Sequence, residues 1–286
     1  MNNWDDLRFL VALSKTGTMT AAAKSLGTNT ATVSRRIERL SESLGMPAFV
    51  KTSEGWRPSE AVASLIQLAQ SFDGELQATL NSQAVDSDAE PVTISIGSLP
   101  VISALVLFPG LKQHGSRLSG VKLNFSDRVF KEGLGEHDIV LQYARPAQGR
   151  IIARKVGSMS YQLYRFVDTP AGEDWAGLGE GHDDAEVMRI GHSTFGRAPR
   201  LRVDSIMALY RLMQTTRLPG PLPDLLAESD PELVPLDPTQ PGNMQECWLF
   251  FHESRRNDPG IRRAVDWVTH CFEQLNTVNM PGTTKI

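Results

Sequence analysis

Three successive helical patterns of hydrophobic positions open the chain. Residues 4–17 and 18–27 predict two short helices, with Thr20 expected as the N-cap of the second. Residues 29–45 predict a third helix that begins after Asn29 as its N-cap. Its hydrophobic residues form one stripe, at Val33, Ile37, Leu40 and Leu44. The pattern therefore predicts a helix, a short turn and a second helix, which is the helix-turn-helix arrangement.

The polar face of the third predicted helix suits the major groove of DNA. Small residues on it allow close approach, while hydroxyl and guanidinium groups can meet phosphates and base edges. Residues 46–58 predict two short extended stretches around a hairpin tip at Ser53, Glu54 and Gly55, which together form a wing. The candidate DNA-binding residues are Thr30, Ala31, Thr32, Ser34, Arg35, Arg36, Arg39 and Lys51.

Residues 59–81 predict one long helix, because hydrophobic residues recur in it at steps of three and four. Gly74 interrupts this helix and weakens it. The hydrophobic stripe needs a partner, either its own domain or the same helix of a second chain. The candidate dimerisation residues are Leu65, Leu68, Phe72 and Leu76. Residues 82–91 are polar and acidic and end in proline, which predicts a linker.

After residue 91 the patterns of strand and helix alternate, which predicts a two-lobed α/β region. The chain is expected to pass between the lobes near residues 144–146, and Pro109 is expected to bend or end a helix. In such folds ligands bind at the carboxyl ends of strands, in the crevice between lobes. Strands are expected at residues 92–97, 121–125, 138–143, 151–156, 161–167, 188–192, 201–203, 232–236 and 247–252, and helices at 101–114, 205–215 and 260–275.

Four residues at expected strand ends are candidates for binding a ligand. Ser98 precedes a helix, where a hydroxyl and exposed N–H groups suit a carboxylate or another anion; an ordinary N-cap is the alternative. Ser193 and Thr194 follow an expected strand, either as a plain turn or as the opposite side of the crevice. Arg128 offers a counter-charge or is a solvated loop residue. The expected ligand is a small organic molecule, and these residues favour an anion.

Composition narrows the class of protein. The chain has 286 residues and a net charge of −4, so it is long enough for more than one core and is no polycation. Residues 1–81 hold equal numbers of basic and acidic side chains, so a DNA-binding surface requires clustered cations. The chain opens with no basic and then apolar stretch, and its most apolar run, at 101–108, is too short to span a membrane. A cytoplasmic protein with no membrane partner is expected.

No sequence pattern calls for catalysis, a cofactor or a metal. The six histidines show no metal-ligand spacing, and phosphate-binding, dinucleotide-binding and hydrolase motifs are missing from the sequence. The two cysteines, Cys247 and Cys271, give neither a disulfide framework nor a metal site. The sequence therefore predicts a protein that is not an enzyme and has no cofactor and no metal.

The N-terminal sixty residues resemble the winged helix-turn-helix of LysR-type transcriptional regulators. Weaker resemblance covers residues 92–98, 137–141 and 246–268, which look like strands and a helix of the family's effector domain. The resemblance implies a C-terminal two-lobed α/β domain similar to periplasmic binding proteins. The matching residues include Phe9, Gly17, Thr18, Ala22, Ala23, Leu26, Val33, Ser34, Arg35, Ile37, Leu40, Leu44, Gly45, Phe49, Thr52, Gly55, Glu60 and Ala61.

The resemblance implies a domain order and a set of partners. A winged helix-turn-helix is expected at residues 1–58, a dimerisation helix at 59–81, a linker at 82–91 and an effector-binding domain at 92–286. The implied partners are double-stranded operator or promoter DNA, a small effector, and further copies of the chain as a homodimer or a homotetramer. Two alternatives stay open: a redox-sensing regulator that uses Cys247 and Cys271, and a solute-binding protein with no gene-regulatory role.

The sequence departs from the family pattern at four places, one of which is the stretch 127–138, shorter than the usual helix and turn. Relatives often carry serine, glutamine and proline at residues 29–31, so their base preference does not carry over. Glu54 stands at the wing tip where relatives have a basic residue, and an acidic tip faces repulsion from phosphates. Residues 215–223 have lost two glycines at a turn that approaches a ligand in relatives, so this contact is in question.

Overall fold

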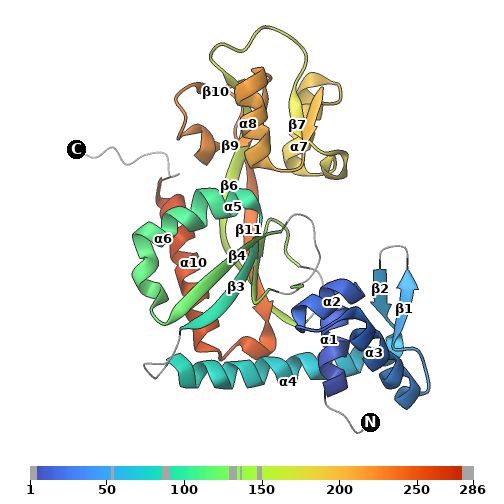
Figure 1. The fold of residues 1–286 in the computed structure, drawn as a ribbon. Helices are drawn as coiled ribbons and strands as arrows, with labels where there is room; N and C mark the ends of the chain where they lie inside the picture. The colour runs from blue at the N-terminus through green and yellow to red at the C-terminus, as the bar shows by residue number, and fades with distance from the viewer. Residues whose placement is uncertain are drawn as a thin grey trace.

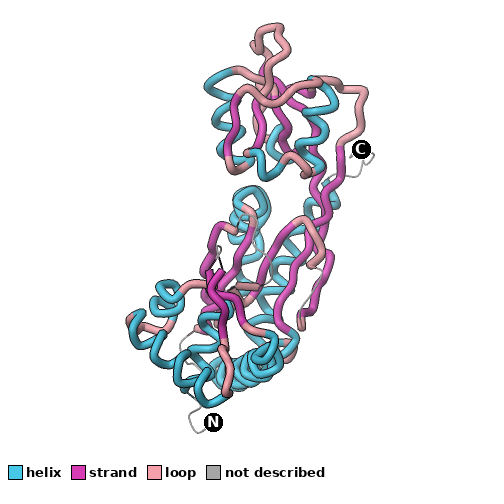
Figure 2. Tube along the Cα trace, turned by 90° about the vertical axis from the view of Figure 1, so that its right-hand side faces the viewer, coloured by secondary structure: helices cyan, strands magenta, loops and turns pink. Residues whose placement is uncertain are grey.

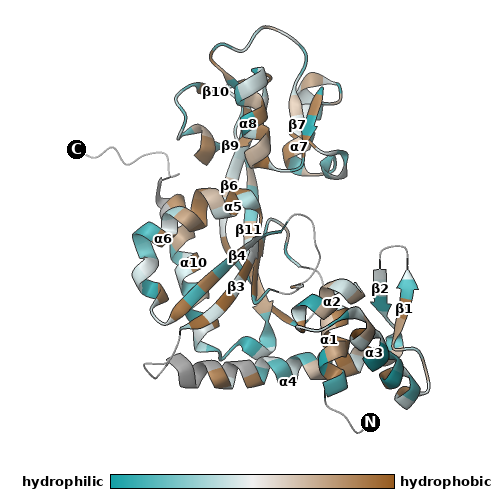
Figure 3. Ribbon diagram, viewed as in Figure 1, coloured by the Kyte–Doolittle hydropathy of each residue, from teal (hydrophilic) through white to brown (hydrophobic). Residues whose placement is uncertain are grey.

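The computed structural model combines a small helical domain, one long helix and two α/β lobes (Figure 1). The lobes lie one above the other and are joined by long strands, as Figure 2 shows from the side. Hydrophobic residues gather on the strands and on the helix faces that are turned toward them (Figure 3). The structure describes residues 5–52, 55–85, 91–128, 134–135, 137–146 and 150–278.

The N-terminal domain begins with helices α1 (Asp5–Thr16), α2 (Met19–Ser25) and α3 (Thr30–Leu44). The expected N-cap at Asn29 is confirmed, since its side chain accepts the Thr32 N–H at 2.8 Å. The expected N-cap at Thr20 is wrong. Thr18 has the extended backbone of a cap and accepts the Ala21 N–H at 3.1 Å, so the helix begins two residues earlier.

A two-stranded hairpin completes this domain, formed by β1 (Phe49–Thr52) and β2 (Gly55–Pro58). This is the predicted wing, although residues 53 and 54 of its tip lie outside the described residues. Gly55 has a φ of 130°, and a Cβ there would lie 2.5 Å from the Gly17 carbonyl oxygen. Only glycine fits this conformation and this contact, and the neighbouring Trp56 N–H donates to the same oxygen at 2.8 Å. The wing is therefore fixed to the turn between α1 and α2.

Helix α4 (Glu60–Val85) connects the N-terminal domain to the lobes. It is longer than expected, since residues 82–85 were placed in the linker. Val62, Ile66 and Ala69 are buried in the core of the N-terminal domain, which anchors the start of the helix. Most of the predicted dimerisation stripe faces away from this core.

The middle of α4 packs closely on the first lobe at Gly74. A Cβ on Gly74 would overlap the Ser254 side chain, with its Cβ only 2.9 Å away. Ser254 belongs to the short helical turn η4 (Glu253–Arg255). The glycine that weakens the isolated helix is thus required by this packing, which a helix pattern alone does not reveal.

The first lobe is built on strands β3 (Val92–Ser98), β4 (Val121–Asp127) and β5 (Ile139–Gln142). Strand β3 is central and pairs in parallel with both others. Helix α10 (Pro259–Val278) covers this sheet together with α5 (Pro100–Ile102), the π-helical turn η1 (Ser103–Leu107), α6 (Phe108–His114) and η2 (Gly115–Leu118). Pro109 does not end the helical run, because the π turn accommodates it: the Phe108 N–H donates to the Ser103 oxygen, five residues back.

Two long antiparallel strands, β6 (Ile151–Phe166) and β11 (Asn243–His252), run through both lobes. The sequence predicted two strands in place of β6. The sheet order is β10, β6, β11, β5, β3 and β4, with β9 also paired to β6. The rest of the second lobe consists of β7 (Ala176–Leu178), η3 (Glu180–His182), α7 (Glu186–Phe195), β8 (Leu201–Val203), α8 (Ile206–Thr216), β9 (Gly220–Pro223), α9 (Asp224–Ala227) and β10 (Leu233–Pro235).

The strand expected at residues 188–192 is wrong, because these residues lie inside helix α7. Met188 and Gly191 are its buried residues, three positions apart as in a helix. Gly191 packs under the Trp175 ring, where a Cβ would lie only 2.9 Å from ring atom Cε3. Tertiary packing therefore explains a glycine that made the local sequence look unlike a helix.

Candidate DNA-binding surface and effector cavity

The N-terminal half of α3 presents a polar face to solvent, and this helix is largely teal in Figure 3. Thr30, Ala31 and Arg35 are exposed on it, while Thr32 and Ser34 are half-buried. Opposite them, Val33, Ile37 and Leu40 are buried in the domain core. Burial of one stripe therefore fixes the orientation of the helix and leaves Arg35 exposed. The Thr32 hydroxyl donates to Asn29 Oδ1 at 3.0 Å and the Ser34 hydroxyl to Glu38 Oε1 at 2.8 Å.

Two of the three predicted DNA-contacting arginines of α3 are bonded within the domain. Asp6 of α1 has a side chain that is only 8 % exposed, and it accepts hydrogen bonds from Arg36 at 2.9 Å and Arg39 at 3.2 Å. The Arg36 guanidinium also lies over the Phe9 ring, 5.4 Å from its centroid. Both arginines therefore hold α3 against α1. Among the described residues, Arg35 has no ion-pair partner.

The wing carries two exposed cations, Lys51 on β1 and Arg57 on β2. Lys51 is exposed on β1 and is paired with Trp56 across the hairpin. Glu54, whose charge counts against a contact between the wing tip and phosphate, lies outside the described residues.

The predicted dimerisation stripe is only partly exposed. Leu65 packs against the core of its own N-terminal domain. Leu68, Phe72 and Leu76 are 66 %, 55 % and 45 % exposed, and Leu80 continues the stripe at 50 %. Four large hydrophobic side chains along one helix face form an apolar strip, which is typical of a protein interface.

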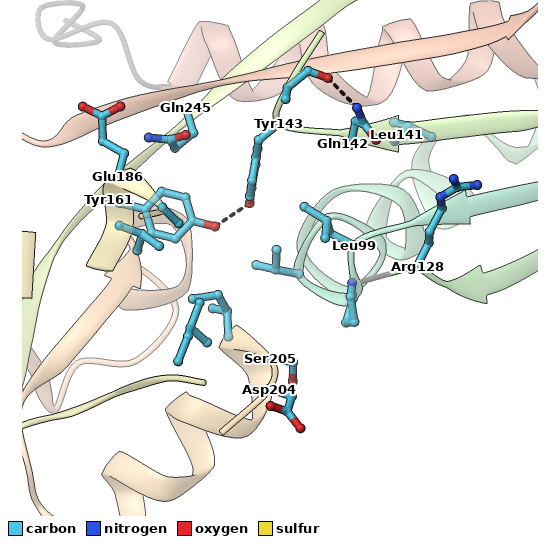
Figure 4. A pocket seen from close by; sticks show the side chains of 17 residues that line it. Leu99, Arg128, Leu141, Gln142, Tyr143, Tyr161, Glu186, Asp204, Ser205 and Gln245 are labelled. Atoms are coloured by element: carbon cyan, nitrogen blue, oxygen red, sulfur yellow. Dashed lines mark hydrogen bonds between the residues drawn. The ribbon is translucent and has the colours of Figure 1, made fainter. Parts of the chain in front are cut away.

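A cavity of about 280 Å³ lies between the lobes. Its walls come from the N-terminal ends of α5, α7 and α8, from the end of β5, and from β6 and β11 (Figure 4). Tyr143, just after β5, and Tyr161 of β6 face each other across it, and their hydroxyls are hydrogen-bonded. The lining residues are Leu99, Pro100, Val101, Arg128, Leu141, Gln142, Tyr143, Ala144, Tyr161, Leu178, Ala185, Glu186, Val187, Asp204, Ser205, Ile206 and Gln245.

Of the four residues predicted to bind an effector, only Arg128 lines this cavity. Ser98 is completely buried, and its hydroxyl bonds to that of Ser103, which the π turn brings close. Ser193 and Thr194 are exposed near the C-terminal end of α7, whereas the cavity touches the other end of that helix. Their placement failed because residues 188–192 form a helix, so no strand end exists there.

Arg128, Glu186, Tyr143 and Tyr161 of the lining have altered pKa values. Burial lowers the pKa of Arg128, whose guanidinium donates to the Leu134 oxygen at 2.7 Å. A hydrogen bond from Asn243 lowers the pKa of Glu186, so this carboxylate is ionised. Burial raises the pKa of both Tyr143 and Tyr161 above the ordinary range, so both phenols are neutral.

The two cysteines lack the features of redox-sensing thiols. Both are free and buried, and burial raises the pKa of each to about 12. Since the thiolate is the reactive form, thiols with these pKa values are unreactive at neutral pH. In the described part of the chain, no group of acidic, histidine or cysteine side chains could hold a metal ion. None of the described helices is long and apolar enough to cross a membrane.

Comparisons with known proteins agree with this architecture. Residues 4–62 match the family model of the bacterial regulatory helix-turn-helix protein, lysR family. The Mau operon transcriptional activator of Paracoccus denitrificans is 27 % identical over 281 residues, covering 95 % of this chain and 97 % of the relative.

Solved structures share the whole fold at low sequence identity. ArgP from Mycobacterium tuberculosis is 16 % identical with a TM-score of 0.65, and covers 95 % of this chain and 97 % of its own. Full-length LysG from Corynebacterium glutamicum, with its effector arginine bound, is 19 % identical with a TM-score of 0.59, covering 95 % and 98 %.

A winged helix-turn-helix joined through a long helix to a two-lobed α/β domain defines a DNA-binding transcriptional regulator with an effector-binding domain, and not an enzyme. Residues 4–62 match the LysR-family helix-turn-helix, and the whole chain is similar to a transcriptional activator in sequence and shares its fold with solved proteins of this architecture.

Proposed function

We propose that this chain is a homodimeric, sequence-specific regulator of transcription whose DNA binding responds to a small organic molecule held in the cavity between the lobes. The observation that carries the DNA-binding part is the exposed face of α3, with Arg35 projecting opposite a buried stripe. In this proposal α3 enters the major groove, Thr30, Thr32 and Arg35 meet base edges or phosphates, and Lys51 of the wing contacts a phosphate. The protein acts in the cytoplasm, where the DNA is.

The exposed strip of α4 supports the dimer. Leu68, Phe72 and Leu76 are hydrophobic side chains that water would otherwise cover, and a second α4 presents the same strip. Two identical modules related by a twofold axis read two half-sites with dyad symmetry. Two dimers that pair on DNA would form a tetramer, which the sedimentation experiment described below distinguishes from a dimer.

The cavity supports the sensing part, since it joins residues from both lobes and is lined mainly by apolar side chains. A ligand there changes DNA binding only if it favours one arrangement of the lobes over another. The relative from Paracoccus denitrificans is named an activator, and we propose the same sign of regulation for this chain.

The test is selection of DNA sequences from a random pool by the full chain, followed by footprinting and sedimentation of the complex. We expect enriched sequences with two inverted half-sites about 34 Å apart or a multiple of it, bound by two copies or four. A pool that shows no enrichment would disprove sequence-specific binding. Enriched sites without dyad symmetry would contradict the dimer.

A further inference from the structure

We infer that the effector buried between the lobes is a compact, uncharged molecule, with a hydroxyl or carbonyl oxygen placed against the Tyr143–Tyr161 pair, and not an organic anion. The inference rests on the proposed function, because it takes this cavity as the effector site. It replaces the expectation of an anionic effector that Ser98, Arg128, Ser193 and Thr194 suggested.

Most of the cavity wall consists of aliphatic side chains. These come from both lobes, so a bound molecule would be enclosed by hydrocarbon on several sides. Burial of an apolar body against them is favourable, whereas a charged group there loses its water without compensation. The aliphatic wall residues are Leu99, Val101, Leu141, Leu178, Val187 and Ile206.

The guanidinium of Arg128, the one basic side chain of the lining, is hydrogen-bonded through its Nη1 atom. The guanidinium donates to the Leu134 oxygen at 2.7 Å and lies 3.4 Å from His137 Nδ1. Figure 4 shows this group directed away from the two phenols. An anion in the cavity would therefore lie against the stem of Arg128 and not against its charge. A buried carboxylate with no cationic partner is costly.

The two acidic residues of the lining also disfavour the binding of an anion. Glu186 and Asp204 are exposed, and their carboxylates point away from the phenol pair (Figure 4). Both charges are negative, so they repel an anion that approaches the cavity. They are also too exposed to offer a buried ion pair to a cation, since water competes for them.

The phenol pair is the polar feature at the centre of the cavity. Tyr161 is 1 % exposed and the two hydroxyls share one hydrogen bond, which uses only one of their two protons. The other recorded acceptor for the Tyr143 hydroxyl is the Met159 sulfur at 3.7 Å, which is a weak one. A hydroxyl or carbonyl oxygen of a ligand would be a stronger acceptor for the second proton.

The volume of the cavity limits the size of the ligand. A volume of about 280 Å³ lies near the lower end of the range of about 300–1,000 Å³ that is usual for small-molecule sites. This favours a compact ligand, such as one six-membered ring with a short substituent.

The test compares molecules that share a body and differ in charge. Benzyl alcohol, benzoate and benzylamine form one set, and cyclohexylmethanol, cyclohexanecarboxylate and cyclohexylmethylamine form a second. Each is titrated into the full chain at neutral pH by calorimetry and by thermal shift. We expect an alcohol to bind at least about tenfold more tightly than the acid and the amine of its set.

Tyr143→Phe is expected to weaken binding of the alcohol about three- to tenfold, because the hydroxyl that donates to the ligand oxygen is lost. The matched control is Tyr210→Phe, since the Tyr210 hydroxyl bonds to Asp230 at 2.7 Å and does not line the cavity. Ala185→Phe fills the cavity and should abolish binding. An alcohol whose affinity is the same in Tyr143→Phe and in wild type would overturn the role of the phenol pair.

The outcomes separate this inference from the proposed function. Tighter binding of an acid or an amine, lost in Ala185→Phe, would refute an uncharged effector but keep the cavity as the site. Binding of an alcohol that survives Ala185→Phe would place the site elsewhere and so contradict the proposed function. Failure of every alcohol to bind at millimolar concentration would also overturn the inference.

Discussion

Neighbouring arginines of α3 are expected to do different work, and two variants separate their roles. Arg35 is exposed and has no ion-pair partner among the described residues, whereas Arg36 bonds to the buried carboxylate of Asp6. We expect Arg36→Ala to loosen the N-terminal domain. We expect Arg35→Ala to leave the domain intact and to weaken DNA binding.

The magnitudes follow from the contacts. Arg36→Ala removes a charge-assisted bond of 2.9 Å, which is worth about 1.5–3 kcal/mol. It also removes the contact with the Phe9 ring, worth about 0.5–1 kcal/mol. Arg39 still holds Asp6 at 3.2 Å, so the net loss is expected near the low end, at about 2 kcal/mol. Arg35→Ala should change stability by less than about 0.5 kcal/mol.

Hydrogen exchange of the full chain measures the stability of α1 to α3 without separating the domains. A loss of about 2 kcal/mol corresponds to roughly 30-fold faster exchange of their core amides in Arg36→Ala. Gel-shift titration on the selected DNA measures the other effect. Loss of a base or phosphate contact in Arg35→Ala is expected to weaken binding roughly 5- to 150-fold.

Two results would refute this reasoning. Wild-type exchange rates in Arg36→Ala would show that the bond to Asp6 does not stabilise the domain. Wild-type DNA affinity in Arg35→Ala, with exchange unchanged, would show that the exposed face of α3 does not contact DNA. Glu42→Ala is a suitable control for both measurements, because Glu42 is exposed near the C-terminal end of the same helix.

Three further predictions test other parts of the structure. Leu68→Glu puts a charge into the apolar strip of α4 and should dissociate the dimer in sedimentation; a dimer of wild-type affinity would argue against that interface. Gly191→Ala pushes a methyl group into the Trp175 ring and should cost about 1–3 kcal/mol in urea unfolding. Burial raises the pKa of Tyr143 and Tyr161, so both phenols stay neutral and their contribution to folding stability is complete below the ordinary pKa of about 10 and is lost only at higher pH. The affinity for benzyl alcohol should therefore be constant from about pH 6 to 9.

The elements of the N-terminal domain were predictable because local patterns specify them. The hydrophobic stripe of α3 and the cap at Asn29 act within a few residues, and both are confirmed. The cap of α2 was misplaced by two residues, since Thr18 and Thr20 are equally good caps by composition. Only the packing of the helix decides between them.

The cavity could not be predicted because its residues meet only through tertiary structure. Tyr161 and Gln245 come from strands that cross between the lobes, about 84 positions apart in the chain. Ser98 looked available to a ligand until the π turn placed Ser103 beside it. Arg128 lines the cavity, but the hydrogen bond from its guanidinium to the Leu134 oxygen has no sequence signal.

Strand β11 links two distant parts of the molecule as one continuous extended segment. It begins beside the cavity, where Gln245 is part of the lining, and it ends at His252, directly before the turn that abuts Gly74 of α4. Ten extended residues span about 30 Å, so a tilt of about 5° around the cavity end displaces the far end by roughly 3 Å.

The contact between Gly74 and Ser254 is too close to absorb such a displacement, because even a Cβ added to Gly74 would overlap the Ser254 side chain. The helix that carries the DNA-binding domain must then move with the strand. A small closure of the lobes around the cavity would therefore produce a larger displacement of the DNA-binding domain. Such a displacement changes the distance between paired DNA-binding domains, and DNA half-sites are spaced by whole helical turns of about 34 Å.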